Sequence, residues 1–184
     1  MHYRTGTYVA FDGLGEVNPS QSDFKYYATL QAWDANRDID FKLTNSHEKT
    51  YAVRDDSSMA TLKARICERL SQSKNMVIVL STDTRKSGSM LSFEIVKAVD
   101  VYKLPLIIAY PDFNSILNVE SHRSVWPTAL SSRIDNGTAR AIHIPFKKEP
   151  ILAAIGQFTV QKSTLTSGKN YYGLESYRIW GLHN

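Results

Sequence analysis

Two short apolar runs separated by a helical pattern stand at the centre of the chain. The runs are residues 76–80 and 104–109, and apolar residues recur at helical spacing between them. A strand, a helix and a second strand within this distance are typical of a parallel βαβ crossover. Strands this apolar are covered on both faces, so we expect these two in the middle of a sheet.

The same hydrophobic and polar patterns predict further elements on both sides of this unit. They are a strand over Thr5–Phe11, a helix from about Ser22, a strand over Asp40–Thr44, a helix over Met59–Leu70, a strand over Arg140–Pro145 and a helix from Pro150. Between the last two strands, residues 111–139 form a long polar segment. Such a length without clear periodicity is typical of function, a partner or irregular helix.

This order of elements predicts one α/β domain with a five-stranded parallel sheet. Helices on both faces make it a doubly wound, flavodoxin-like sheet with the strand order 2-1-3-4-5. We assign residues 1–162 to this domain, a length that suits a single core. Residues 163–184 are polar and aromatic, and we expect a C-terminal appendage packed on the domain or extending from it. Its aromatic side chains indicate either packing or a partner surface.

A ligand site in such a sheet has a predictable place. The crevice lies beyond the carboxyl ends of the strands, where the winding changes direction. Here that point falls between the first and third predicted strands, so its rim is Phe11–Gly13 and Ser81–Asp83. The loop over residues 84–89 lies above the crevice, and Ser46 in the loop after the second strand is close enough to contribute.

Glu94 is the acidic candidate at this crevice. At 100° per residue it lies roughly 80° from the centre of the apolar stripe of its helix, so we expect a half-buried carboxylate at the mouth. An acid that complements the helix dipole is the alternative. If Ser87 or Ser89 is the N-cap, however, Glu94 stands in the second turn, where that benefit has decayed. Both interpretations stay open on spacing.

Composition narrows the classes of protein. Of the 184 residues 42% are hydrophobic and 22% charged, as in an ordinary globular chain. The sequence shows no apolar run of about 20 residues and no secretory leader, so we expect no membrane contact. It has one cysteine, Cys67, which we expect to be buried and which cannot form an internal disulfide. The cytoplasm is therefore the natural setting. The net charge of +4 comes from scattered Lys and Arg, which do not favour nucleic-acid binding. The five histidines lack metal-ligand spacing, so we expect no metal site.

The segment from residue 62 to residue 110 carries a recognisable motif. An apolar strand is followed by Ser81-Thr82, a variable basic loop, Ser92-Phe93-Glu94-Ile95 and the strand that contains residues 106–108. Over roughly residues 5–160 the chain resembles the TIR-like family, specifically the bacterial branch that includes the TIR proteins of the Thoeris anti-phage system. It departs from that branch at Met90 and Leu91, where an aromatic residue, typically Trp, is often found.

The resemblance implies an activity on NAD. It implies cleavage of the nicotinamide–ribose bond and production of a cyclic ADP-ribose isomer that signals to a partner effector, with self-assembly of the TIR protein. NAD would be a substrate, and no cofactor is expected. The transition state carries positive charge at the anomeric carbon, and a carboxylate beside the ribose stabilises it. Glu94 would take this catalytic role.

The resemblance also suggests which residues contact the ligand. Phe11 would stack on a ring, Asp12 and Gly13 would let the backbone approach, and Ser46 and Ser81 would line the rim. Arg85, Lys86 or Arg54 would meet the pyrophosphate. Each of these residues also has an ordinary structural explanation, as core, turn or solvated loop.

Other functions remain open on the sequence. A non-catalytic TIR-like interaction module is the main alternative, with a vestigial pocket. A response-regulator receiver shares the strand order, but Asp12 and Asp83 match its acids only loosely and Lys147 stands in a poor context. A nucleoside deoxyribosyltransferase also places a glutamate beside a ribose.

Overall fold

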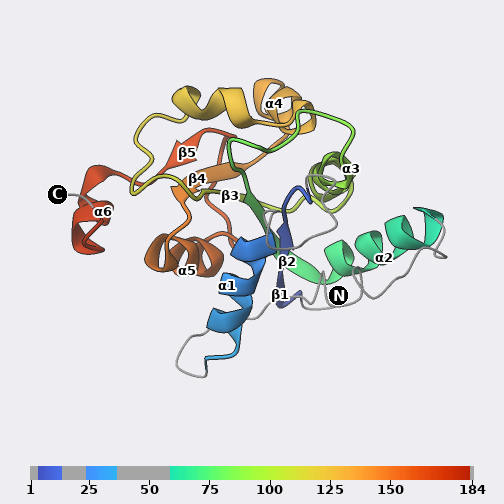
Figure 1. Cartoon of the computed structure of the whole chain (residues 1–184), viewed down its shortest axis with the longest axis horizontal. Helices are drawn as coiled ribbons and strands as arrows, with labels where there is room; N and C mark the ends of the chain where they lie inside the picture. The colour runs from blue at the N-terminus through green and yellow to red at the C-terminus, as the bar shows by residue number, and fades with distance from the viewer. Residues whose placement is uncertain (1–3, 14–23, 37–58, 183–184) are drawn as a thin grey trace.

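The computed structural model describes residues 4–13, 24–36 and 59–182 (Figure 1). Its centre is a parallel sheet in which five strands follow one another in the order β1-β2-β3-β4-β5. The strands are β1 (Gly6–Ala10), β2 (Ser73–Val79), β3 (Leu106–Tyr110), β4 (Ala141–Pro145) and β5 (Asn170–Tyr171).

The helices connect and cover these strands. They are α1 (Phe24–Asp34), α2 (Met59–Gln72), α3 (Met90–Val96), α4 (Thr128–Asp135), α5 (Lys148–Gln157) and α6 (Leu174–Ile179). A π-helical turn over Lys97–Val101 continues α3, and a 3-10 turn over Glu120–Val125 precedes α4. Within the described ranges no helix combines the length and the apolar character that crossing a bilayer requires.

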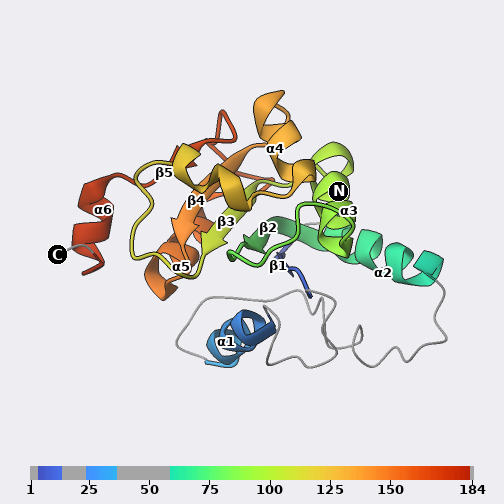
Figure 2. The ribbon, with the colours of Figure 1, turned by 45° about the horizontal axis from the view of Figure 1, so that its top comes forward.

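The sheet is buried on both faces, as the apolar runs predict. Side chains alternate along β1, so that Tyr8 and Ala10 enter one core and Val9 and Phe11 enter the other. Helices α2, α3 and α4 cover the first face, whereas α1 and α5 cover the second (Figures 1 and 2). The core therefore has three layers, with the sheet in the middle.

The predicted α/β class and the all-parallel sheet are confirmed. Strands β1, β2, β3 and β4 correspond to the first, third, fourth and fifth predicted strands, and they are neighbours in that order. The predicted second strand, residues 40–44, lies outside the described residues. The fifth strand of the described sheet instead comes from the tail, where Asn170 pairs with Ile142 and Tyr171 with His143. Two residues are too few to show a strand periodicity, so the pattern did not indicate β5. The domain boundary after residue 162 stays a prediction.

The segment over residues 111–139 is the helical crossover between β3 and β4. It holds the 3-10 turn and α4, so the expected irregular helix is present, and a role in function or partner binding stays a prediction. Tyr172 and Tyr177 of the tail pack, as one interpretation proposed, whereas Tyr171 is exposed: Tyr172 lies against Phe158, and the buried Tyr177 hydroxyl donates to the Ile116 carbonyl. Cys67 is half-buried rather than buried, because its position lies on the margin of the α2 apolar stripe.

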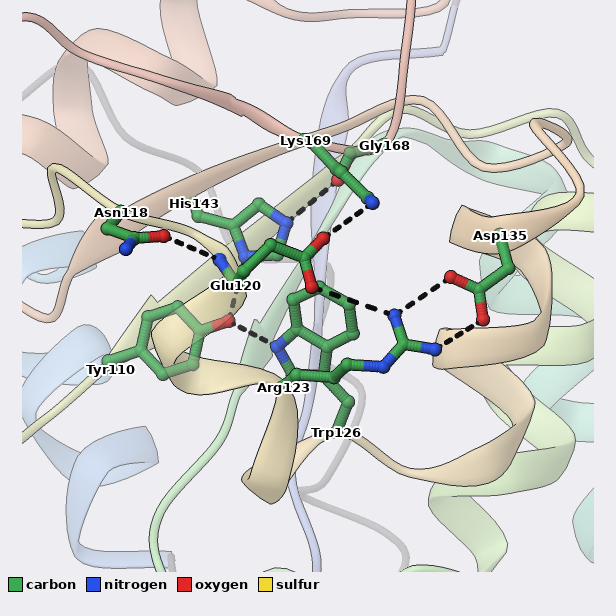
Figure 3. Close-up of polar contacts among 9 residues, drawn as sticks. All are labelled: Tyr110, Asn118, Glu120, Arg123, Trp126, Asp135, His143, Gly168 and Lys169. Carbon is green, nitrogen blue, oxygen red and sulfur yellow. Dashed lines mark hydrogen bonds and ion pairs between the residues drawn. The ribbon is translucent and has the colours of Figure 1, made fainter.

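A buried chain of hydrogen bonds ties the crossover and the tail to the sheet (Figure 3). The Trp126 indole donates to the Tyr110 hydroxyl at 2.8 Å, that hydroxyl lies 2.7 Å from His143 Nδ1, and His143 Nε2 lies 2.8 Å from the Gly168 carbonyl. Because the Gly168 carbonyl only accepts, His143 carries its proton on Nε2, and in the neutral ring Nδ1 then accepts the hydrogen of the Tyr110 hydroxyl. Burial lowers the pKa of His143 to about 4, so the ring is neutral. His143 is thus a packed, neutral residue of the sheet.

Candidate functional site

The carboxyl ends of β1 and β2 lie side by side, because the two strands are paired in parallel up to Ala10 and Ile78. Phe11–Gly13 and Leu80–Ser81 follow directly. Helix α3 begins after Ser89, whose extended backbone makes it the N-cap, and this places Glu94 in the second turn as expected. The first and third predicted strands and the following helix therefore meet where the sequence analysis places the candidate site.

Glu94 is the buried acid of this site. Its exposed fraction is 4%, and its Oε1 accepts a hydrogen bond from the Tyr8 hydroxyl at 2.5 Å. The prediction of a half-buried carboxylate was therefore wrong about depth. A helical projection considers one helix only, whereas here β1 supplies a partner that draws the carboxyl group into the interface between α3 and the sheet.

The protonation state of Glu94 follows from this burial. Loss of solvent raises its pKa to about 8, while the Tyr8 hydrogen bond acts in the opposite direction and the charge of Asp12 adds to the rise. Burial, and then the neighbouring Glu94, raises the pKa of Tyr8 well above its usual value, so its hydroxyl stays a donor. At neutral pH most molecules hold an uncharged carboxyl group at this position.

Asp12 joins the end of β1 to the loop after β2. Its buried carboxylate accepts the Arg85 backbone N–H at 2.9 Å, and the Arg85 guanidinium binds it through Nε and through Nη2 at 2.6 Å. The Asp12 hydrogen bonds raise the pKa of Arg85, whose side chain is 43% exposed. The structure thus brings these two predicted site residues together, with one holding the other in place.

The remaining residues that were predicted to contact the ligand differ in how far they are buried. Phe11 is buried and lies 6.0 Å from the Tyr27 ring, which is a core position. Ser81 is buried in a turn closed by reciprocal hydrogen bonds with Thr84. Gly13 is partly exposed, and a Cβ added there would meet no described atom within 4 Å. Ser46 and Arg54 lie outside the described residues.

Lys86 packs the loop onto the crossover. Its ammonium donates to the Trp126 carbonyl at 3.3 Å, and its own carbonyl accepts the Thr128 N–H at 2.8 Å. Burial lowers the pKa of Lys86. Its position favours a structural role over the pyrophosphate contact that the resemblance suggested.

Tyr8 is the site residue that the sequence pattern did not single out. Strand alternation places it on a core face, but nothing local points to Glu94, which is 86 positions away. A usable signal did exist, because a buried tyrosine hydroxyl needs a polar partner. In the described ranges no group of three or more His, Cys, Asp or Glu residues could hold a metal ion.

A doubly wound parallel sheet with an acid in the helix that follows β2 is an arrangement found in TIR-like α/β domains, among other doubly wound proteins. A family model described as the TIR-like domain of the Thoeris protein ThsB matches residues 8–116 of the chain. This range is more than half of the chain, and the chain belongs to that family of the Thoeris anti-phage defence. The match contains Tyr8, Asp12, Arg85 and Glu94, and it ends before α4, earlier than the resemblance suggested.

Proposed function

We propose that this protein cleaves the nicotinamide–ribose bond of NAD and releases a cyclic ADP-ribose-type signal for a partner effector. NAD is the substrate, and the reaction needs no further cofactor. The observation that carries the proposal is the position of Glu94, a buried carboxyl group fixed by Tyr8 beside the carboxyl ends of two adjacent parallel strands. Membership in a TIR-like family supports the same reaction class.

The chemistry requires little beyond electrostatic stabilisation. The bond between the anomeric carbon and the nicotinamide nitrogen breaks, its electron pair goes to that nitrogen, and neutral nicotinamide leaves without a proton. Positive charge develops on the ribose, where the Glu94 carboxylate stabilises it in a medium of low dielectric constant. Water, which gives up a proton to the solvent, or a nucleophilic atom of ADP-ribose itself then forms the new bond to the anomeric carbon.

Glu94 must lose its proton for this role. With a pKa of about 8 the free protein holds it largely uncharged at pH 7. The nicotinamide ring of NAD brings a positive charge that favours the carboxylate, so binding drives the proton off. The Tyr8 hydroxyl donates to Oε1 throughout and holds the carboxylate in one orientation.

Arg85 is suited to the pyrophosphate. Asp12 occupies its Nε and Nη2, while Nη1 donates to no atom of the described chain. The guanidinium is therefore oriented by a buried acid and keeps a donor for a phosphate oxygen. This arrangement fixes the side chain before the ligand arrives, which reduces the entropy lost on binding.

The test compares nicotinamide release by the wild type and by Glu94→Gln. Each protein is incubated with NAD, with and without lysate from infected cells, and the products are separated by chromatography. Removing the carboxylate should lower turnover by about a hundredfold or more, while the variant unfolds no more readily than the wild type. The matched control is Glu149→Gln, an exposed acid in the first turn of α5, which should keep its activity. If Glu94→Gln retains its turnover, the proposed mechanism is wrong.

Tyr8→Phe provides a second, independent variant. It removes the hydrogen bond that lowers the pKa of Glu94, so its activity should reach half-maximum at a higher pH than in the wild type. A merely structural tyrosine would lower activity equally at every pH.

A non-catalytic interaction module is the second candidate, because apolar side chains are exposed away from the rim. Phe113, Leu117 and Ile179 are 40%, 41% and 76% exposed, and the Tyr177 hydrogen bond to Ile116 brings α6 to the segment after β3. No nicotinamide release under any condition, together with specific binding of a defence partner that is lost on Ile179→Ser, would favour this function.

A further inference from the structure

A cavity of about 170 Å³ lies at the amino ends of the strands, opposite the carboxyl ends near Glu94. Its polar lining is formed by Lys103, Arg140, Thr159, Gln161 and Ser163. Lys103 stands just before β3 and Arg140 just before β4, so the cavity is at the amino ends of these strands. The segment that follows α5 forms the opposite wall.

The lining carries two cations and no acid. Within the described chain, neither the Lys103 ammonium nor the Arg140 guanidinium has an ion-pair or hydrogen-bond partner among the protein side chains. The charge of Lys103 does act on the nearby Asp100. That carboxylate, however, is already bound by Arg133 through both of its oxygens. The two cavity cations are therefore available to an anion.

Hydrogen bonds position the far wall of the cavity. Thr159 is buried, its N–H donates to the Lys162 carbonyl at 3.0 Å, and its Oγ1 accepts the Lys162 N–H at 3.0 Å. The Gln161 amide donates to the Arg4 carbonyl. Because Oγ1 serves here as an acceptor, the Thr159 hydroxyl hydrogen remains for a ligand. Fixed donors of this kind need little ordering on binding.

The backbone of Lys103 adds an independent observation. Its φ of 54° is positive, which among the described residues is seen at no other non-glycine position. It follows Tyr102 at the end of the helical segment, where glycine is usual because it adopts this conformation freely. A cation there also complements the helix dipole, but the dipole does not account for Arg140 or for the hydroxyl groups across the cavity.

We propose that this cavity binds a phosphate group. Two cations with hydroxyl and amide donors match a phosphate dianion, and the arginine fork suits its paired oxygens. The volume of about 170 Å³ is well below the about 300–1,000 Å³ of pockets that enclose whole organic ligands. The cavity therefore holds one phosphate, either inorganic or the terminal phosphate of a nucleotide whose remainder lies outside.

The experiment titrates the full chain with inorganic phosphate and separately with adenosine monophosphate, at constant ionic strength, by NMR. The wild type should bind in the millimolar range or tighter. Arg140→Gln and Lys103→Asn should each weaken binding about tenfold or more, and asparagine is chosen because it tolerates a positive φ. Lys148→Gln removes one charge at the opposite edge of the sheet and should change nothing.

The ligands distinguish the two sources of phosphate. Tighter binding of the nucleotide with the same dependence on Arg140 identifies a terminal phosphate, and equal or weaker binding identifies the free ion. Equal affinity in all four proteins, or no saturation at about 10 mM, would overturn the proposal. The outcome does not depend on NAD cleavage, because no residue of the Glu94 site is changed.

Discussion

Glu94 carries its proton at neutral pH because desolvation outweighs its hydrogen bond. Its pKa rises from 4.5 to about 8 on burial, although Tyr8 donates to it. Between these two values the folded protein binds one proton that the unfolded chain has released. The stability that this group contributes is therefore fully present below pH 4.5 and is lost as the pH rises toward 8.

Glu94→Gln should remove this loss of stability with rising pH. Glutamine keeps an oxygen for the Tyr8 hydroxyl and does not ionise. The free energy of unfolding of the variant should gain on that of the wild type by up to about 1.4 kcal/mol per pH unit between pH 4.5 and 8. Urea unfolding of both proteins across this range measures the difference, and a difference that does not change with pH contradicts the assignment.

The site residues were predictable to different degrees. Glu94 could be found because the helical phase and the strand ends are local features of the sequence. Its partner Tyr8 could not, and neither could the pairing of Asp12 with Arg85, which are 73 positions apart. Arg85 was predicted from its charge as a ligand contact, whereas the structure first gives it a role toward Asp12.

At the scale of elements, Gly168 fixes the tail to the sheet and the crossover. Its carbonyl lies 2.8 Å from His143 Nε2. A Cβ added at this position would lie 2.9 Å from Ile134 Cγ1 and 3.2 Å from the Ala139 carbonyl oxygen. The Ile134 side chain is itself packed in the core, so it has little room to move.

Gly168→Ala should therefore destabilise the protein by about 1–3 kcal/mol through overpacking. Gly156→Ala is the matched control, because Gly156 lies in α5 and an added Cβ would meet no other side chain within 4 Å in the described part of the protein. That change should be neutral or should stabilise by up to about 1 kcal/mol, since alanine favours helix. Thermal unfolding compares the two variants. Equal melting temperatures would contradict the prediction, because they would show that the Ile134 side chain moves aside without cost.

Elements were predictable where the apolar pattern was long. Strands β2 and β3 were found from their continuous runs, and α2 from its repeated spacing. Helix α4 buries only Leu130 and Ile134, a pair that is too short to establish a period. Strand β5 exists because β4 offers it a partner, which no pattern within residues 170–171 contains.

At the scale of the whole molecule, two buried groups titrate with opposite effects on stability. Burial lowers the pKa of His143 from 6.5 to about 4. The stability that this ring contributes is present above pH 6.5 and is lost as the pH falls toward 4. Glu94 behaves in the opposite way, so the two contributions oppose each other at every pH where both groups titrate.

The wild type should lose stability between pH 6.5 and pH 8. In this range Glu94 gives up its proton, whereas between about pH 4.5 and pH 6.5 its effect is offset by His143 and His122, whose pKa values are both lowered by burial. Glu94→Gln should instead rise from pH 4.5 to pH 6.5 and then level off. Denaturant unfolding over this range gives both profiles, and a wild-type profile that climbs steadily to pH 8 would contradict this prediction.

The sequence by itself determined the α/β class, the parallel sheet and the helix that carries Glu94, because apolar periodicity and strand ends are local properties of the chain. Only the tertiary structure decided how deep that acid lies, which tyrosine holds it, how Asp12 orients Arg85 and where the tail joins the sheet. These features depend on contacts between residues 86, 73 and 25 positions apart, and burial, which sets the pKa of each group, exists only once those contacts have formed.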